Sequence, residues 1–444
     1  MEAKRNTWTA ALFLLGLAAG VLFLLFGVLP QRASFRAVDR PARSDAAAET
    51  LTLTRQSAPA DRALRPDAQV QPLLAFREAD RAVSGVIDGA DPAINKALDR
   101  DNAFIELYGG IQRLLGRSVI EDVDPEYTVV KLPGDVLSFA NLDAVQVGMD
   151  QQVADFVSFQ RLVQQYYDIP MLYVQAPHKL DLAQLPEGVS DYSSAEADQF
   201  LAGLAANGVD TLDLRPAFRE ALASGEAELS DLFFRTDHHW TPAGAFLGYQ
   251  AIYGALADRY GLSFDPALTD PDSFDRTVLP QRSLGSQGKR VGSLYAGLDD
   301  FELWAPKFET RFHYTASLEG IDREGPFERS LLFPERLAED DVYEANDYTI
   351  YAGGDYSMSR AVNEKDPDGP RILVIRDSFG CALTPFLSLG AGEVITMDPR
   401  AFSGDPLQYI GWLKPDVIVT TFTTSSLRLE ALWPFFQSAG ATNF

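Results

Sequence analysis

The chain has 444 residues, 46% of them hydrophobic and 23% charged, which suits a globular protein of roughly two to three domains. Its net charge of −25 repels phosphate backbones, so the composition argues against a nucleic-acid partner. The single cysteine, Cys381, excludes an intrachain disulfide, and its apolar surroundings predict a small buried residue and not a nucleophile.

The first feature along the chain is an uncharged apolar run at residues 8–30. A bilayer core requires about 20 such residues, whereas a cleaved signal has a shorter apolar region and a small-residue cleavage site. We therefore predict an N-terminal transmembrane anchor over residues 1–30. Lys4 and Arg5 precede the run and four arginines follow it, so the count of basic residues alone places the body of the chain in the cytoplasm. Because large domains translocate largely regardless of charge, we expect the body outside.

Residues 31–95 are rich in Ala, Arg, Asp, Ser and Pro and show weak periodicity, which predicts a poorly ordered stalk. The remaining residues, 96–444, are expected to form one α/β domain. Between two well-patterned halves, residues 262–345 are acidic, rich in Phe and irregular. Such an excursion often covers or edges a functional site.

Hydrophobic patterns predict alternating helices and strands in this domain. Ser193-x-x-Glu196 is typical of a capping box, and Thr241 followed by Pro242 suits the start of another helix. The predicted helices are 151–167, 193–207 and 242–260, and the predicted strands are 169–176, 209–214, 371–375, 393–397 and 416–420. This alternation predicts a parallel sheet with helices on both faces.

A candidate nucleophile follows one of these strands. Ser378 lies in the segment RDSFG, just past the strand RILVI, and ligands of open α/β sheets bind at the carboxyl edge of the strands. There the hydroxyl is exposed, and the backbone N–H of Ser378 is one donor for an oxyanion. The alternative is that Ser378 only caps the following helix.

A candidate base lies in the segment TDHHWT. Asp237 and His239 are two residues apart, so in an extended segment their side chains point the same way, and Asp237 can orient His239 as the base for Ser378. In that geometry His238 points away. One alternative is that both histidines bond backbone groups in a tight loop. Another uses Asp237, His238 and His239 as metal ligands. It is less favoured, because adjacent histidines diverge in an extended segment and no second His-rich segment completes the site.

The segments TDHHWTPAGA and LVIRDSFG together resemble the DHHW protein family and are similar to alginate O-acetyltransferases and related SGNH-hydrolase-like proteins of exopolysaccharide export. The segments VQAPHKLD, GGDYS and MDPRAF agree with this resemblance. It implies a three-layer SGNH-hydrolase-like fold, an extracytoplasmic location and an acyl-enzyme formed on Ser378, with His239 and Asp237 completing a triad. It implies no metal and no cofactor.

Two departures from the family pattern affect the oxyanion hole. Arg376 replaces the glycine that usually precedes Asp-Ser, and no Asn of the SGNH oxyanion block is evident. Gly353, Gly354 and Arg400 are the residues we assign to oxyanion or substrate binding; the alternatives are a turn for the glycines and an ion pair for the arginine.

The resulting expectation is a membrane-anchored O-acetyltransferase or acetylesterase. Its acceptor would be a cell-surface or secreted polysaccharide, and its acetyl donor would be delivered by a membrane acyltransferase. One triad serves both transfer and hydrolysis, so the sequence leaves the two open. The alternative from another class is a non-catalytic glycan-binding or polysaccharide-assembly protein on the same fold.

Overall fold

The computed structural model describes residues 102–122, 125–140 and 148–438. The predicted transmembrane anchor and stalk, and the predicted domain boundary at residue 96, lie outside these residues. No helix within the described residues is long and apolar enough to cross a bilayer.

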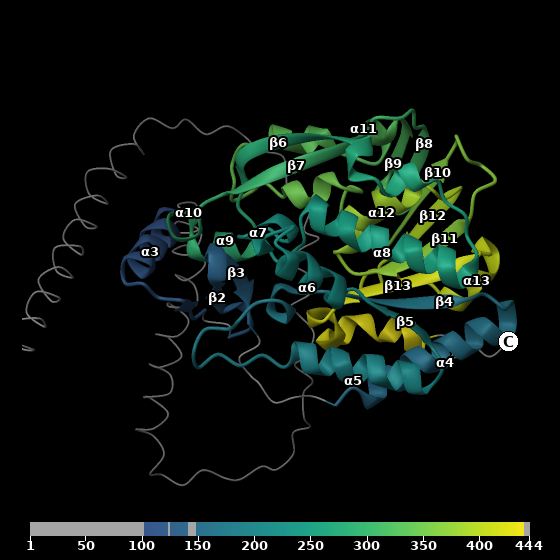
Figure 1. Ribbon diagram of the computed structural model, residues 1–444, viewed down its shortest axis with the longest axis horizontal. Coiled ribbons are helices and arrows are strands. Elements are labelled where there is room, and N and C mark those ends of the chain that lie inside the picture. The colour runs from purple at the N-terminus through teal and green to yellow at the C-terminus, as the bar shows by residue number, and fades with distance from the viewer. Residues whose placement is uncertain (1–101, 123–124, 141–147, 439–444) are drawn as a thin grey trace, which may run out of the picture. The chain divides into compact units, whose positions relative to one another are not determined.

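An eight-stranded sheet with the order β5-β4-β13-β11-β12-β10-β8-β9 lies at the centre of the described residues (Figure 1). Its strands are β4 Met171–Ala176, β5 Asp210–Asp213, β8 Phe312–Ala316, β9 Ile321–Gly325, β10 Met358–Asn363, β11 Arg371–Arg376, β12 Glu393–Met397 and β13 Val417–Thr423. The five strands from β5 to β12 are parallel, whereas β10, β8 and β9 each run antiparallel to the neighbour before them. The sheet is therefore mixed, and the prediction of a parallel sheet is wrong for three strands.

The antiparallel pairing of β8 with β9 has a simple cause in the chain connection. Only residues 317–320 separate β8 from β9, and a connection this short can join antiparallel strands but not parallel ones. Both strands come from the excursion 262–345, so the expectation of an irregular excursion is also wrong. Alternate residues of β8 are buried, Phe312, Tyr314 and Ala316, as expected of a strand with one covered face.

Helices cover both faces of the sheet, as predicted. Along β11, Ile372 and Val374 pack toward one layer while Leu373 and Ile375 pack toward the other, because successive side chains of a strand point to opposite faces. Figure 1 shows α8 and α12 on one side of the sheet and α4 and α5 on the other. The helices are α4 Asp150–Tyr167, α5 Ser193–Ala206, α6 Arg215–Ser224, α7 Leu229–Leu232, α8 Pro242–Tyr260, α11 Phe327–Ser330, α12 Gly380–Ser388, α13 Pro406–Leu413 and α14 Pro434–Gln437.

The starts of two helices test the capping predictions. Thr241 caps α8, because its hydroxyl accepts a hydrogen bond from Gly244 N at 3.1 Å and Pro242 is the first helical residue, as predicted. The prediction of a capping box at the start of α5 is wrong. Ser193 is already helical and its hydroxyl donates to Asp191, while Glu196 is buried and pairs with Arg428.

Smaller elements accompany the central sheet, and of these the pair β6 and β7 packs in the layer that contains α8. Strands β1 Val119–Ile120, β2 Val129–Leu132 and β3 Val136–Phe139 form a small antiparallel sheet, and β6 Phe274–Ser283 pairs with β7 Asp299–Pro306. Between β6 and β7 lie the short helices α9 Ser286–Val291 and α10 Ser293–Ala296, and α3 Ala103–Leu114 packs on both. The contact is close because Gly109 of α3 lies against the carbonyl of Val291.

Two neighbouring glycines of α3 allow a matched test of this packing. A Cβ at Gly109 would lie 1.7 Å from Val291 O, so we expect Gly109→Ala to destabilise the fold by about 1–3 kcal/mol through overpacking. At Gly110 the nearest atom, in Leu294, is 3.5 Å away. Gly110→Ala should therefore stabilise the helix by about 0.5–1 kcal/mol. Urea unfolding of both variants measures the difference, and equal midpoints would contradict the packing.

Candidate active site

Ser378 lies in the turn between β11 and α12, at the carboxyl edge of the parallel strands. The turn is held by the buried carboxylate of Asp377, which accepts from Phe379 N at 3.0 Å and from Thr423 N at 2.8 Å. It also accepts from the hydroxyl of Ser426 at 2.7 Å. These bonds fasten the turn to the end of β13, so the position of Ser378 is fixed by the sheet itself. None of the hydrogen bonds among the described residues uses the Ser378 amide as a donor, so this N–H is available to a ligand.

Asp237, His238 and His239 lie in a loop directly before α8. Phe233 and Trp240 form an isolated antiparallel bridge, and Phe234 N donates to His239 O at 3.2 Å, which closes the loop at its base. The buried carboxylate of Asp299 accepts from the backbone N–H groups of Arg235 and Thr236 at 2.9 and 2.8 Å. The chain is therefore bent here, and the predicted extended segment is wrong.

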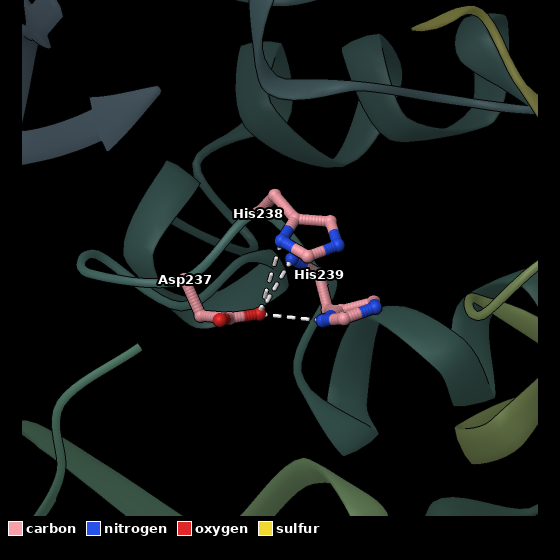
Figure 2. A group of neighbouring side chains, drawn as sticks. All are labelled: Asp237, His238 and His239. Atoms are coloured by element: carbon pink, nitrogen blue, oxygen red, sulfur yellow. Dashed lines mark hydrogen bonds and ion pairs between the residues drawn. The ribbon is translucent and has the colours of Figure 1, made fainter. Parts of the chain in front are cut away.

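The structure brings Ser378, His239 and Asp237 together. His239 Nε2 lies 2.8 Å from Ser378 Oγ, and His239 Nδ1 lies 2.5 Å from Asp237 Oδ1. The same carboxylate oxygen accepts from His239 N at 3.1 Å, which fixes the carboxylate and the imidazole relative to each other (Figure 2). This is the order of contacts, hydroxyl to imidazole to carboxylate, that nucleophilic catalysis by serine requires.

The environment of Asp237 favours its ionised form. Burial alone would raise the pKa of Asp237, but the charges of His239 and His238 and the hydrogen bonds from His239 and from Ser286 N hold it well below its ordinary value. The bond from Ser286 N to Oδ2 is 2.8 Å long. Ser286 is the first residue of α9, so the excursion supplies one donor to this carboxylate.

His238 does not point away, contrary to the prediction. Its ring centroid lies 3.7 Å from that of His239, and its Nδ1 lies 2.8 Å from Ser286 Oγ and 3.7 Å from Asp237 Oδ1 (Figure 2). The cause is the bend of the loop, since alternation of side chains holds only in extended backbone. Burial and the neighbouring His239 lower the pKa of His238 to about 3, so its imidazole is neutral at pH 7.

Two aromatic residues that the sequence did not single out hold the loop against the serine turn. Trp240 Nε1 and the hydroxyl of Tyr348 both donate to Phe379 O, at 3.0 and 3.1 Å. The Tyr348 ring also stacks on His239, with 3.7 Å between centroids. Tyr348 lies in a short 3₁₀ helix, Asp347–Ile350, and a single aromatic residue in an irregular segment gives no periodic signal.

A pocket of about 210 Å³ opens beside Asp237, His238 and His239. The excursion edges it, as its place between the two patterned halves predicted, through residues 283–286, Lys289 and Ala345. Asn346 lies in the wall with an exposed side chain, and Lys289 reaches across to donate to Ala345 O at 2.7 Å. The wall therefore offers an amide, hydroxyls and an ammonium group to a polar ligand.

The three residues predicted for oxyanion or substrate binding lie in a neighbouring cluster. Arg400 is paired with Asp398 and Asp355, and the carbonyl of Gly354 accepts from Arg376 at 3.0 Å. Gly353 and Gly354 both have positive φ, 79° and 125°, so this is also a turn that favours glycine. Among the described residues no hydrogen bond joins Gly353, Gly354 or Arg400 to Ser378, His239 or Asp237. Their role in substrate binding stays a prediction.

Arg376 and Cys381 pack behind the serine turn. Arg376 is 1% exposed, pairs with Asp355 at 2.5 Å, and covers Gly380, where a Cβ would lie 2.4 Å from the arginine side chain. Cys381 is buried as predicted, and burial raises the pKa of its thiol. The arginine in place of the usual glycine thus packs against Gly380 and pairs with Asp355.

The metal alternative has more geometric support than the sequence suggested. One ligand atom from each of Asp237, His238 and His239 lies within 4.8 Å of the others (Figure 2). However, His239 Nδ1 and Asp237 Oδ1 are already bonded to each other at 2.5 Å. A zinc ion at about 2.0–2.2 Å from both atoms would have to separate them and break this bond.

Comparisons with known proteins agree with this fold. Residues 131–283 match the family model described as an SGNH hydrolase-like domain, acetyltransferase AlgX. Residues 219–396, which include Asp237, His239 and Ser378, match the model of DHHW proteins. The predicted resemblance is confirmed. No curated protein sequence matches the chain.

Solved structures share the architecture at low identity. PatB1 from Bacillus cereus is 21% identical, with 71% of this chain and 99% of that chain covered and a TM-score of 0.56. A PatB1 structure with a sulfonyl adduct is 20% identical, with 70% and 99% covered and a TM-score of 0.56. A DHHW family protein from Eubacterium siraeum is 16% identical, with 72% and 98% covered and a TM-score of 0.53. The chain has an SGNH-like α/β fold with a mixed central sheet.

A glycine next to Asp237 provides a test of the site geometry. A Cβ at Gly285 would lie 2.1 Å from the Cβ of Asp237, so Gly285→Ala should displace the carboxylate from His239. We expect loss of the downfield proton resonance of the Asp237–His239 hydrogen bond. Gly254→Ala, in α8 with nothing within 4 Å, is the control and should keep the resonance. An unchanged resonance in Gly285→Ala would show that Asp237 does not need this close approach.

Proposed function

We propose that the protein is a membrane-anchored, extracytoplasmic serine enzyme that transfers or hydrolyses O-acetyl groups on a cell-surface or secreted polysaccharide. The observation that carries the proposal is the continuous contact from Ser378 Oγ through His239 to Asp237, at 2.8 and 2.5 Å. The matched family description, which names an SGNH hydrolase-like acetyltransferase domain, supports acetyl as the group transferred.

Each residue has a defined part in the proposed reaction. His239 Nε2 takes the proton of Ser378 Oγ, and the oxygen attacks the carbonyl carbon of the acetyl donor. His239 then gives the proton to the departing donor oxygen, which leaves acetyl-Ser378. The Ser378 N–H faces the oxyanion, and ionised Asp237 keeps His239 in the Nδ1–H tautomer and stabilises its cationic form.

The acceptor in the second half of the proposed reaction determines the product. A sugar hydroxyl gives its proton to His239 and attacks the acetyl carbon, which restores Ser378 and forms an ester. Water in the same position gives acetate. The acidic chain, with its net charge of −25, favours a neutral sugar acceptor over a polyanion. The acetyl donor would reach Ser378 from a membrane acyltransferase, next to which the predicted anchor at residues 1–30 would hold the domain.

The direct test is covalent labelling of Ser378. Wild-type protein should react with a fluorophosphonate or a sulfonyl fluoride and turn over a chromogenic acetyl ester. Ser378→Ala should lose labelling and lower kcat by at least about 10³-fold. Ser224→Ala, which changes a serine of α6 outside the site, is the control. Equal labelling of all three proteins would exclude Ser378 as the nucleophile, whereas absence of labelling and turnover in all three would favour a glycan-binding role. Addition of an oligosaccharide then separates transfer from hydrolysis by the appearance of an acetylated sugar.

Substitutions of the two adjacent histidines distinguish a catalytic triad from a metal site. We expect His239→Gln to lose activity to the same degree as Ser378→Ala, because both remove a member of one unit. His238→Gln should cause a much smaller loss, and a chelator should leave the wild-type rate intact. Equal losses in the two variants, together with inhibition by a chelator that zinc reverses, would instead support a metal site.

A further inference from the structure

The outward face of α3 is apolar and exposed. Six large hydrophobic side chains, five in the helix and one at its C-cap, follow one another at spacings of three or one residues and form a single stripe. They are Phe104, Leu107, Tyr108, Ile111, Leu114 and Leu115. Leu294 of α10, also exposed, lies beside Gly110 and widens the stripe. A continuous patch of this kind marks a surface for a protein or a membrane, whereas single exposed apolar residues are ordinary.

The helix cannot turn to bury this face. Its inner side is occupied, because Gly109 lies against Val291 O and the carboxylate of Glu106 accepts from Ser293 N at 2.8 Å and from Leu294 N at 2.7 Å. The hydroxyl of Tyr343 donates to the same carboxylate at 2.6 Å. The stripe is therefore held outward by close packing and by hydrogen bonds from α10.

Along residues 103–117 the charge is opposite in sign to that of the chain as a whole. Within residues 103–117 the only acidic residue is Glu106, whose carboxylate is bonded inward, while Arg113 and Arg117 are exposed. The chain as a whole carries −25. An apolar stripe of Phe, Tyr, Leu and Ile next to exposed arginines is typical of a surface that enters the interfacial layer of an anionic bilayer.

We propose that this face of α3, with Leu294, contacts the lipid surface. The chain reaches α3 directly from residues 1–101, which include the uncharged run 8–30, so a tether of sufficient length joins the stripe to the predicted anchor. The inference rests on the membrane location proposed above but not on the chemistry of Ser378. Because α3 packs on α9, whose residue Ser286 bonds Asp237, lipid contact would place the pocket next to the membrane.

A single spin label tests this contact in the full chain. Cys381 is 1% exposed and burial raises the pKa of its thiol, so a new surface cysteine is labelled selectively. Leu114→Cys, at a position 88% exposed, reports on the stripe, and Leu318→Cys, at a position 83% exposed on another surface, is the matched control. Each labelled chain is reconstituted into vesicles of phosphatidylcholine and phosphatidylglycerol, and relaxation by oxygen is compared with relaxation by a soluble nickel chelate.

The expected result is a several-fold higher ratio of oxygen to nickel relaxation at residue 114 than at residue 318. Adding Leu107→Asp to the labelled chain should abolish this difference without lowering the thermal midpoint. Dipolar broadening between labels at residue 114 would overturn the proposal in favour of a second copy, and shielding from both reagents would overturn it in favour of cover by protein. If the chain fails to float with the vesicles while Ser378 still reacts with a fluorophosphonate, the membrane location is wrong and the chemistry stands.

Discussion

The carbonyl oxygen of Phe379 is the acceptor on which the site depends. It accepts hydrogen bonds from Trp240 Nε1 and from the hydroxyl of Tyr348, so one atom joins the serine turn, the histidine loop and the 3₁₀ helix Asp347–Ile350. Each of these segments is irregular by itself. Their common acceptor, together with the stacking of Tyr348 on His239, converts three loops into one rigid unit. Precise placement of this kind matters because a serine and its base act only within hydrogen-bond reach.

Buried charge is concentrated around the same unit, and Asp377, Asp299 and Lys179 each form hydrogen bonds there. Asp377 fastens the serine turn to β13, and Asp299 holds the backbone of the histidine loop. Lys179, fully buried, donates to Leu137 O at 2.6 Å, and burial lowers its pKa to about 8 against the opposing effect of Asp237 and Asp299. Buried hydrogen bonds of this sort restrict the number of arrangements that the surrounding loops can adopt.

The sequence predicted the parallel part of the fold well, because strands buried on both faces are short apolar runs between helical patterns. Strand β12 has the predicted bounds, and α8 begins at the predicted cap. Strands β8 and β9 were missed because each has only five residues and lies within a polar stretch. The position of His238 was missed because it depends on a bend, which the rule of alternating side chains does not describe.

The sequence predicted a site residue only where a reactive side chain lies next to a clear boundary of a helix or strand. Asp237, His239 and Ser378 lie next to clear element boundaries, and the structure brings them together. Ser286, Tyr348 and Asp299 lie in segments without a regular pattern, and their importance arises from contacts made across the fold. No spacing along the chain indicates that Ser286 N meets Asp237.

The separation of His239 and Ser378 by 139 residues has a consequence for the order of folding. Contacts so distant along the chain form only after the entropic cost of closing the loop between them has been offset by the packing of the intervening strands and helices. During synthesis, the histidine loop emerges well before β11 and its serine. A nascent chain that has not reached residue 378 carries the loop without Ser378, so the contact between His239 and Ser378 forms only when the sheet is completed.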